Sequence, residues 1–285
     1  MRIARTASQT IFILPAFVHY TKRNTKPLLD NITTLAFLIA IGLGAGTLGS
    51  MLGVGGGIIM VPALTFLNLP PTQAASTSLI AVMSTSISST IEYSRQKRID
   101  YALGLEMAAC AIPGGVLGAI MSEYLLEDTF KLYFGILLIL TGLYILYKNS
   151  VLKDHRAKRR SLSLQIAVFA ASFGAGIISS LFGVGGGIVF VPAMLLVLGL
   201  TMYRAAPTSQ LTLMMTAIAG VFTHSVLGHP DYLQAVVLSA GAFVGAQIGA
   251  RLSRMTKDML LQRLLAIVLL AVAITLILDG LSIRY

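Results

Sequence analysis

The sequence contains GAGTLGSMLGVGGGIIMVPAL at Gly44–Leu64 and, later, GAGIISSLFGVGGGIVFVPAM at Gly174–Met194. Of these 21 aligned positions, 13 are identical. Downstream of each copy a second match follows, in which AASTS at Ala74–Ser78 corresponds to AAPTS at Ala205–Ser209. Two matches in the same order and at nearly the same spacing indicate that one ancestral unit was duplicated and fused.

The composition assigns the chain to the membrane. Of its 285 residues, 56% are hydrophobic and only 11% are charged, whereas a soluble domain carries about 25% charged residues. This excludes a soluble enzyme, a secreted disulfide scaffold and a disordered protein. Lipid leaves no backbone group unpaired, and no alternating ten-residue pattern of a β-barrel is present. The sequence therefore predicts an all-α polytopic membrane protein.

The charges indicate topology rather than a nucleic-acid partner. The net charge is +10, but the basic residues lie in short runs between apolar stretches, as in cytoplasmic loops of membrane proteins. We expect a leader at residues 1–30, a first transmembrane repeat at 31–147, a basic cytoplasmic linker at 148–163 and a second repeat at 164–285. Cys110 is the single cysteine, so the chain forms no internal disulfide.

Each repeat is expected to contain four or five helical segments, eight to ten in total, and the first helix of each is broken by glycines. The apolar segments are Thr33–Leu52, Ile58–Leu69, Ala74–Ile91, Ala102–Met121, Phe130–Tyr147, Leu164–Phe182, Ile188–Leu200, Ala205–Val226, Ala235–Ala250 and Leu260–Leu278.

The orientation of the halves depends on whether the broken first segment crosses the membrane once or folds as a hairpin. One crossing gives parallel halves, and a hairpin gives inverted halves with both termini outside. The first segment has about 37 residues, or about 55 Å of helix, against a hydrocarbon core of about 30 Å. Its length favours inverted repeats, although the Lys and Arg distribution does not separate the two arrangements.

The GVGGG runs are the strongest local signal for a site. Four glycines in five residues disfavour a helix by about 1 kcal/mol each, so the helix should break and the next one should begin there. Such a helix start directs unpaired N–H groups and a positive dipole end at its surroundings, which attracts anions. The alternative is that the glycines only allow close helix packing, which we also expect for Gly114, Gly118, Gly241, Gly245 and Gly249.

Hydroxyl, amide and basic side chains near the breaks could complete an anion site. The substrate-binding candidates are Gly53, Gly55, Gly56, Gly57, Thr77, Ser78, Gly183, Gly185, Gly186, Gly187, Arg204, Thr208, Ser209 and Gln210. Pro62 and Pro192 would bend the half-helices, and Glu92 and His224 are titratable residues at matching helix ends. We regard these four as gating or coupling candidates, and we expect no metal site and no cofactor.

The doubled G-x-GGG-x-x-x-VP-A motif, each copy followed by [AS]-x-TS, resembles the TauE/SafE sulfite exporter family, also called TSUP or DUF81 membrane permeases. The resemblance covers about Thr33 to Leu278. It implies transport of sulfite, organosulfonates or other small sulfur-containing anions. The second copy departs from the first where Pro207 replaces Ser76 and Arg204 replaces Gln73, so a strictly symmetric site is not expected.

The resulting hypothesis is a secondary transporter, and specifically an exporter, of small sulfur-containing oxyanions in the bacterial inner membrane. Its expected partners are the anion, a coupling proton or sodium ion and the lipid bilayer, with no nucleic acid; the sequence does not determine the oligomeric state. The sequence has no catalytic set, so it is not expected to be an enzyme. The alternative is a membrane scaffold or assembly protein whose glycine motifs serve helix packing only.

Overall fold

The computed structural model describes residues 32–124 and 162–282, together with residues 132–133, 135–136, 138–140 and 142–143. The expected leader and the basic linker up to Ser161 lie outside these residues, as does half of the expected segment Phe130–Tyr147. The chain divides into two compact units, residues 1–38 and 39–285. Residues 32–38 are the described part of the first unit and form the start of a helix; all contacts discussed below lie within the second.

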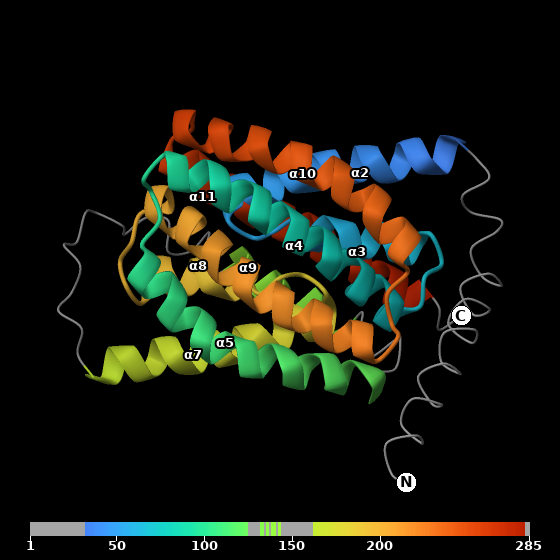
Figure 1. Cartoon of the computed structure of the whole chain (residues 1–285), viewed down its shortest axis with the longest axis horizontal. Helices are drawn as coiled ribbons and strands as arrows, with labels where there is room; N and C mark the ends of the chain where they lie inside the picture. Colours follow the sequence, from blue (N-terminus) through green and yellow to red (C-terminus); the bar gives the residue numbers. More distant parts are fainter. Residues whose placement is uncertain are drawn as a thin grey trace, which may run out of the picture. The chain divides into compact units, whose positions relative to one another are not determined.

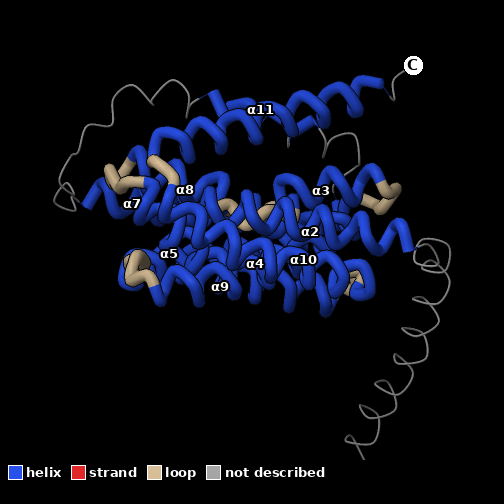
Figure 2. The backbone as a smooth tube through the Cα atoms, turned by 90° about the horizontal axis from the view of Figure 1, so that it is seen from above, coloured by secondary structure: helices blue, strands red, loops and turns tan. Residues whose placement is uncertain are grey.

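The described residues form helices and contain no strand, which confirms the all-α prediction (Figure 2). Six of the helices are long and apolar enough to cross a membrane, as a polytopic protein requires. The elements are α2 (Ile32–Leu52), α3 (Gly57–Phe66), α4 (Pro71–Arg95), α5 (Tyr101–Met121), η1 (Ser122–Tyr124), α7 (Leu162–Phe182), α8 (Gly187–Leu196), α9 (Met202–Val226), α10 (Tyr232–Met255) and α11 (Asp258–Ser282).

Small residues allow α10 to pack closely against α2. A methyl group added at Gly241 or Gly245 would lie 2.3 or 2.2 Å from the carbonyl oxygens of Ile39 and Leu43. No side chain fits in such a gap, so the predicted packing role of these glycines is confirmed. Because the contacts advance together along both helices, α2 runs parallel to α10.

The same relation holds between α5 and α7, which lie side by side in Figure 1. An added methyl group at Gly114 or Gly118 would lie 2.2 or 2.3 Å from the carbonyl oxygens of Phe173 and Ile177. The first helix of each half therefore packs against the fourth helix of the other half.

Helices α2 and α4 both run parallel to α10. Ser84 and Ser88 of α4 donate hydrogen bonds to the carbonyls of Ser239 and Phe243 of α10, at 3.1 and 2.7 Å. From Ile39 onward α2 runs in the same direction as α4, so the chain returns between the end of α2 and the start of α4 through α3.

Helices α4 and α9 run antiparallel. They carry the two matching TS pairs, Thr77-Ser78 in α4 and Thr208-Ser209 in α9. Thr77 near the start of α4 accepts a hydrogen bond from Asp231, which follows the end of α9. Arg98, which follows the end of α4, donates to the carbonyl of Tyr203 at the start of α9. These two matching helices thus have opposite directions, as they would in inverted repeats.

Candidate functional site

Both glycine runs interrupt their helices as the sequence predicts. In the first run, φ is +79° at Gly53, +87° at Gly55 and +83° at Gly56, values that glycine adopts without steric cost. In the second run, Gly183, Gly185 and Gly186 have φ of +69°, +80° and +36°. Helices α3 and α8 then begin without a capping side chain. The N–H groups of Ile59 and Val189 donate to the carbonyls of Gly56 and Gly186, at 3.1 and 2.9 Å, and that of Gly187 donates to the carbonyl of Gly185. The N–H groups of Ile58 and Ile188 have no backbone acceptor in the described part of the chain.

The two breaks lie against one another at the centre of the helices. A Cβ added at Gly57 would lie 2.5 Å from the carbonyl oxygen of Gly183 and 2.6 Å from the Cα of Val184. The reciprocal contact is present, because a Cβ at Gly187 would lie 2.5 Å from the carbonyl oxygen of Gly53. The starts of the two half-helices therefore meet, and only glycine permits this approach.

Apolar side chains cover the breaks in this conformation. Val82 of α4 and Leu213 of α9 are both buried. A Cβ added at Gly55 or Gly185 would lie 2.9 or 2.5 Å from a methyl carbon of Val82, and 3.3 or 3.4 Å from Leu213. The centre is consequently closed by packed hydrocarbon.

The TS pairs link each half to the break or helix start of the other. The Ser78 hydroxyl donates to the carbonyl of Gly183 at 3.0 Å, and Ser209 donates to the carbonyl of Gly53 at 2.7 Å. These serines hold the first residue of each glycine run in place.

The threonine of each pair acts on the backbone that precedes the fourth helix of the other half. Thr77 Oγ1 accepts the N–H of Asp231, and Thr208 Oγ1 accepts the N–H of Asp100, both at 3.0 Å. The two aspartates in turn cap α10 and α5 with their carboxylates. The structure brings all four hydroxyl residues to the contact between the halves, where they bind backbone groups.

Gln210 has no equivalent in the first half, where Leu79 occupies the matching position. Its Nε2 donates to the carbonyl of Gly49 at 2.9 Å, one turn before the first break. Its Oε1 is buried and has no hydrogen-bond partner in the described part of the chain. Gln210 therefore leaves one acceptor unused beside the first glycine run.

The charged candidates lie elsewhere. Arg204 is exposed in the first turn of α9. Glu92, at the end of α4, lies 3.5 Å from Arg251 and 4.0 Å from Arg95, whose side chains are largely exposed. The structure does not bring these charges to the breaks, whereas Pro62 and Pro192 are buried inside α3 and α8.

Three polar residues near the helix ends escaped the sequence analysis. Tyr93 donates from its hydroxyl to the carbonyl of Ser50 at 2.8 Å. Arg98 is 1% exposed although it lies in a short loop, and His229 contacts His224. The internal alignment could have identified them, since it places Tyr93 with His224 and Arg98 with His229.

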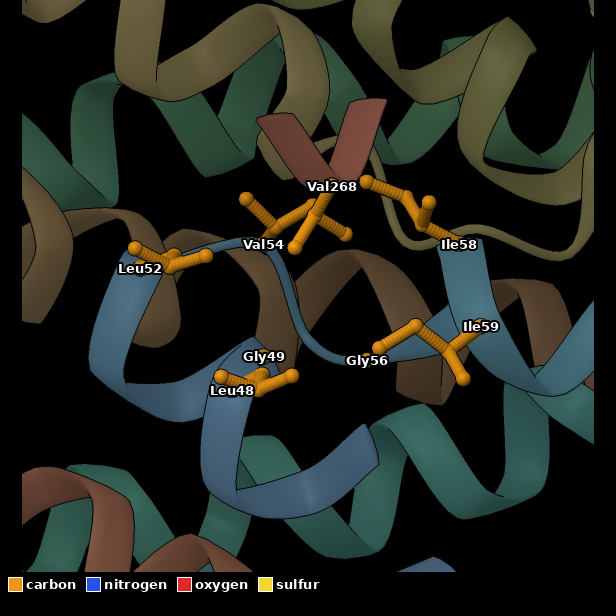
Figure 3. A pocket seen from close by; sticks show the side chains of 8 residues that line it. All are labelled: Leu48, Gly49, Leu52, Val54, Gly56, Ile58, Ile59 and Val268. Carbon is orange, nitrogen blue, oxygen red and sulfur yellow. The ribbon is translucent and has the colours of Figure 1, made fainter. Parts of the chain in front are cut away.

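A small apolar pocket adjoins the first break, on the side of α11 (Figure 3). Its cavity volume is about 10 Å³, which is about the room that one water molecule needs. The residues that line it are Leu48, Gly49, Leu52, Val54, Gly56, Ile58, Ile59 and Val268. No lining side chain is polar, and the pocket is too small for an oxyanion in this conformation. The described residues contain no cluster of three or more His, Cys, Asp or Glu side chains placed to bind a metal ion.

Comparison with known proteins gives consistent matches over most of the chain. Residues 38–276 match the protein family described as sulfite exporter TauE/SafE. The probable membrane transporter protein YunE of Bacillus subtilis is 33% identical over 269 residues, which cover 87% of this chain and 98% of that protein. The probable membrane transporter protein YfcA of Escherichia coli K12 is 26% identical over 246 residues, covering 86% and 90% respectively.

Proposed function

We propose, since the chain belongs to the sulfite exporter TauE/SafE family, that it is a secondary transporter that exports small sulfur-containing oxyanions such as sulfite or organosulfonates. The relatives described above are named as membrane transporters, and six helices of the chain are suited to span a membrane. Both facts agree with a multi-pass carrier rather than an enzyme. We assign it to the bacterial inner membrane.

The meeting of the two uncapped helix starts supports this proposal most directly. An oxyanion that loses its water without new partners is penalised by several kcal/mol. The starts of α3 and α8 can supply backbone N–H donors and the positive ends of two helix dipoles. Gln210, Ser78 and Ser209 lie beside the same glycine runs. The site needs no buried basic side chain, which agrees with the exposure of Arg204.

Transport requires that the apolar side chains over the breaks, Val82 and Leu213, move apart so that the site opens in turn to each side of the membrane. Antiparallel α4 and α9 support an inverted-repeat arrangement, in which the same motion can serve both sides. Val82 and Leu213 lie on these two helices and would separate when the centre opens. The sequence has no GK[ST] phosphate-binding loop, so a proton or sodium gradient, or the gradient of the anion itself, drives the cycle.

A scaffold or assembly role is the second candidate function. It is supported by the close backbone contacts of Gly57 and Gly187, where a side chain would meet the backbone of the opposite break. A scaffold would need the closed centre but would not move ions through it. The two functions therefore differ in one measurable property, the flux of anions.

The deciding experiment is counterflow in proteoliposomes. Purified protein would be reconstituted and screened with sulfite, thiosulfate, sulfate, taurine, sulfoacetate and simple carboxylates. We expect saturable flux of at least one sulfur-containing anion, faster in Val82→Ala because the apolar cover becomes smaller. Ile91→Ala on the same helix, where the side chain is exposed, is the matched control and should keep the wild-type rate. Absence of flux for every anion would favour the scaffold.

A further inference from the structure

One buried cluster beside the breaks is apolar, whereas its counterpart in the internal alignment is partly polar. Leu79 and Val82 of α4 pack with Ala217 of α9, and all three side chains are buried. The residues at the matching positions are Gln210, Leu213 and Ser86. The leucine and the alanine of the apolar cluster therefore correspond to a glutamine and a serine.

Gln210 and Ser86 lie on the same side of the centre, next to the side chains that cover the breaks. Val82 and Leu213 meet at Gly55, since a Cβ added there would lie 2.9 and 3.3 Å from them. Ser86 lies one helical turn after Val82, on the same face of α4. Gln210 likewise lies one turn before Leu213 on α9. Because α4 and α9 run antiparallel, both steps lead away from the centre in the same direction.

Both polar side chains have an atom without a hydrogen-bond partner in the described part of the chain. These atoms are Gln210 Oε1 and Ser86 Oγ, and both residues are 0% exposed. An unpaired buried polar group is destabilising, whereas the leucine and the alanine at the matching positions need no partner. Two such groups side by side are accounted for if a bound molecule supplies their partners.

The backbone fixes which atom of the Gln210 amide is left unpaired. Its Nε2 donates to the carbonyl of Gly49 at 2.9 Å, and this bond requires the NH₂ group on that side. The Oε1 is therefore directed away from that carbonyl. The Gly49 carbonyl also accepts the N–H groups of Val54 and Gly55, at 2.8 and 3.1 Å. The unpaired acceptor of Gln210 thus adjoins the turn that leads into α3.

This arrangement offers a ligand both kinds of hydrogen-bonding group. The start of α3 provides donors for anionic oxygens, because the N–H of Ile58 has no backbone acceptor in the described residues. Gln210 Oε1 can only accept, so its partner must be an O–H or N–H group. The Ser86 hydroxyl can donate or accept and therefore fits the same group. Sulfate, which carries no hydrogen at neutral pH, would leave the Gln210 acceptor unpaired.

We propose that Gln210 and Ser86 form a subsite that selects oxyanions which also carry a hydrogen-bond donor. Resting on the proposed transport function, this narrows the substrate class to hydrogen sulfite and to sulfonates with a hydroxyl or protonated amino group. Val82 and Leu213 must move apart before such an ion can enter, so the subsite opens together with the centre. The selection acts from one side only, since the matching leucine and alanine offer no side-chain hydrogen bond.

The test compares ions that match in charge and size but differ in the donor. Hydroxyethanesulfonate is compared with propanesulfonate, in which a methyl group replaces the hydroxyl group. Hydrogen sulfite, in mildly acidic buffer, is compared with methanesulfinate, in which a methyl group again replaces the hydroxyl. Dissociation constants would be measured by isothermal titration calorimetry with the purified full chain in detergent. This measurement requires no transport.

Two substitutions replace each polar residue by the one at the matching position. Gln210→Leu and Ser86→Ala reproduce the cluster of Leu79 and Ala217, which the chain already contains. In Gln210→Leu, the Gly49 carbonyl keeps its two backbone donors. Both variants should therefore fold, and thermal unfolding in detergent verifies this.

We expect the wild type to bind the donor-bearing member of at least one pair about tenfold more tightly. This preference should fall to about twofold or less in Gln210→Leu and should fall about threefold in Ser86→Ala. Gln247→Leu is the matched control, because its amide donates to the carbonyl of Ser88 between α10 and α4. It should keep the wild-type preference. The pair that shows the preference tells whether the donor lies on the oxyanion itself or on its substituent.

Two results would overturn the subsite while leaving the proposed transport intact. One is equal binding of both members of each pair, and the other is a preference that is unchanged in either Gln210→Leu or Ser86→Ala. Failure of every sulfur-containing anion to bind would instead overturn the transport proposal and the subsite together. The two kinds of failure are therefore distinguishable.

Discussion

The centre of the molecule and its two ends differ in how strictly the halves resemble one another. At the centre, Gly57 and Gly187 make reciprocal contacts with the opposite break, and the added-Cβ distance to the facing carbonyl is 2.5 Å in both. At the ends, a tyrosine with an arginine takes the place of a histidine pair. The centre thus preserves residue type, whereas the ends preserve only the hydrogen bond to a helix carbonyl, that of Ser50 or Ser180.

This difference has a steric reason. Where two backbones approach within van der Waals contact, no residue other than glycine has room. Both halves therefore have glycine at these matching positions. A carbonyl oxygen at a helix end accepts any suitably placed donor, so an O–H and an N–H serve equally well there. The ends can therefore carry different side chains while the centre stays the same.

The largest expected effect comes from a methyl group at the centre. Gly57→Ala and Gly187→Ala should each lower the free energy of unfolding by about 3 kcal/mol or more, because the backbone of the opposite half must move. Thermal unfolding in detergent, followed by size-exclusion chromatography, measures this. Unfolding temperatures like that of the wild type would show that the breaks are not packed as described and would remove the contrast with the ends.

The second-largest effect on the free energy of unfolding should distinguish the end that contains Arg98 from the end that contains His229. Arg98→Met leaves the Tyr203 carbonyl and the Gln96 Oε1 without the guanidinium donor, which should lower the free energy of unfolding by about 2–3 kcal/mol. His229→Gln should have an effect of about 1 kcal/mol, since that side chain is partly exposed. Equal effects of the two substitutions would contradict the difference in burial and charge.

Removal of the Thr77 and Thr208 hydroxyls tests whether they stabilise the contact between the two halves of the chain. Thr77→Val and Thr208→Val each leave an aspartate N–H without its acceptor, so each should lower the free energy of unfolding by about 1–2 kcal/mol. Thr47→Val is the matched control, because its exposed hydroxyl bonds only within α2. If the threonine variants keep full stability but bind the transported anion more weakly, these hydroxyls serve the ligand instead of the backbone.

The smallest effect is expected at two matching glycines that contact nothing. Apart from its own stretch of helix, a Cβ added at Gly44 or Gly174 has no heavy atom of the described residues within 4 Å. Both lie inside helices, so Gly44→Ala and Gly174→Ala should raise the free energy of unfolding by up to about 1 kcal/mol through helix propensity. Unfolding temperatures of the two variants check this, and a marked loss in either would indicate a contact that the structure does not contain.

Much of the architecture could be predicted from the sequence. The apolar composition and the lipid environment require helices, and the glycine runs at Gly53–Gly57 and Gly183–Gly187 require breaks. The start of α3 at Gly57 and of α8 at Gly187 agrees with these expectations to within one residue. These features follow from local backbone energetics, which depend on the residue itself and its neighbours in the chain.

The partners of the polar side chains were decided only by the tertiary structure. The sequence shows that Thr77, Ser78, Thr208 and Ser209 can donate or accept, but not that backbone groups of the opposite half face them. It likewise does not show that Arg204 is exposed while Arg98 is buried between tyrosine rings. Helical periodicity gives the face on which a side chain lies, whereas the neighbour it meets depends on how distant helices pack.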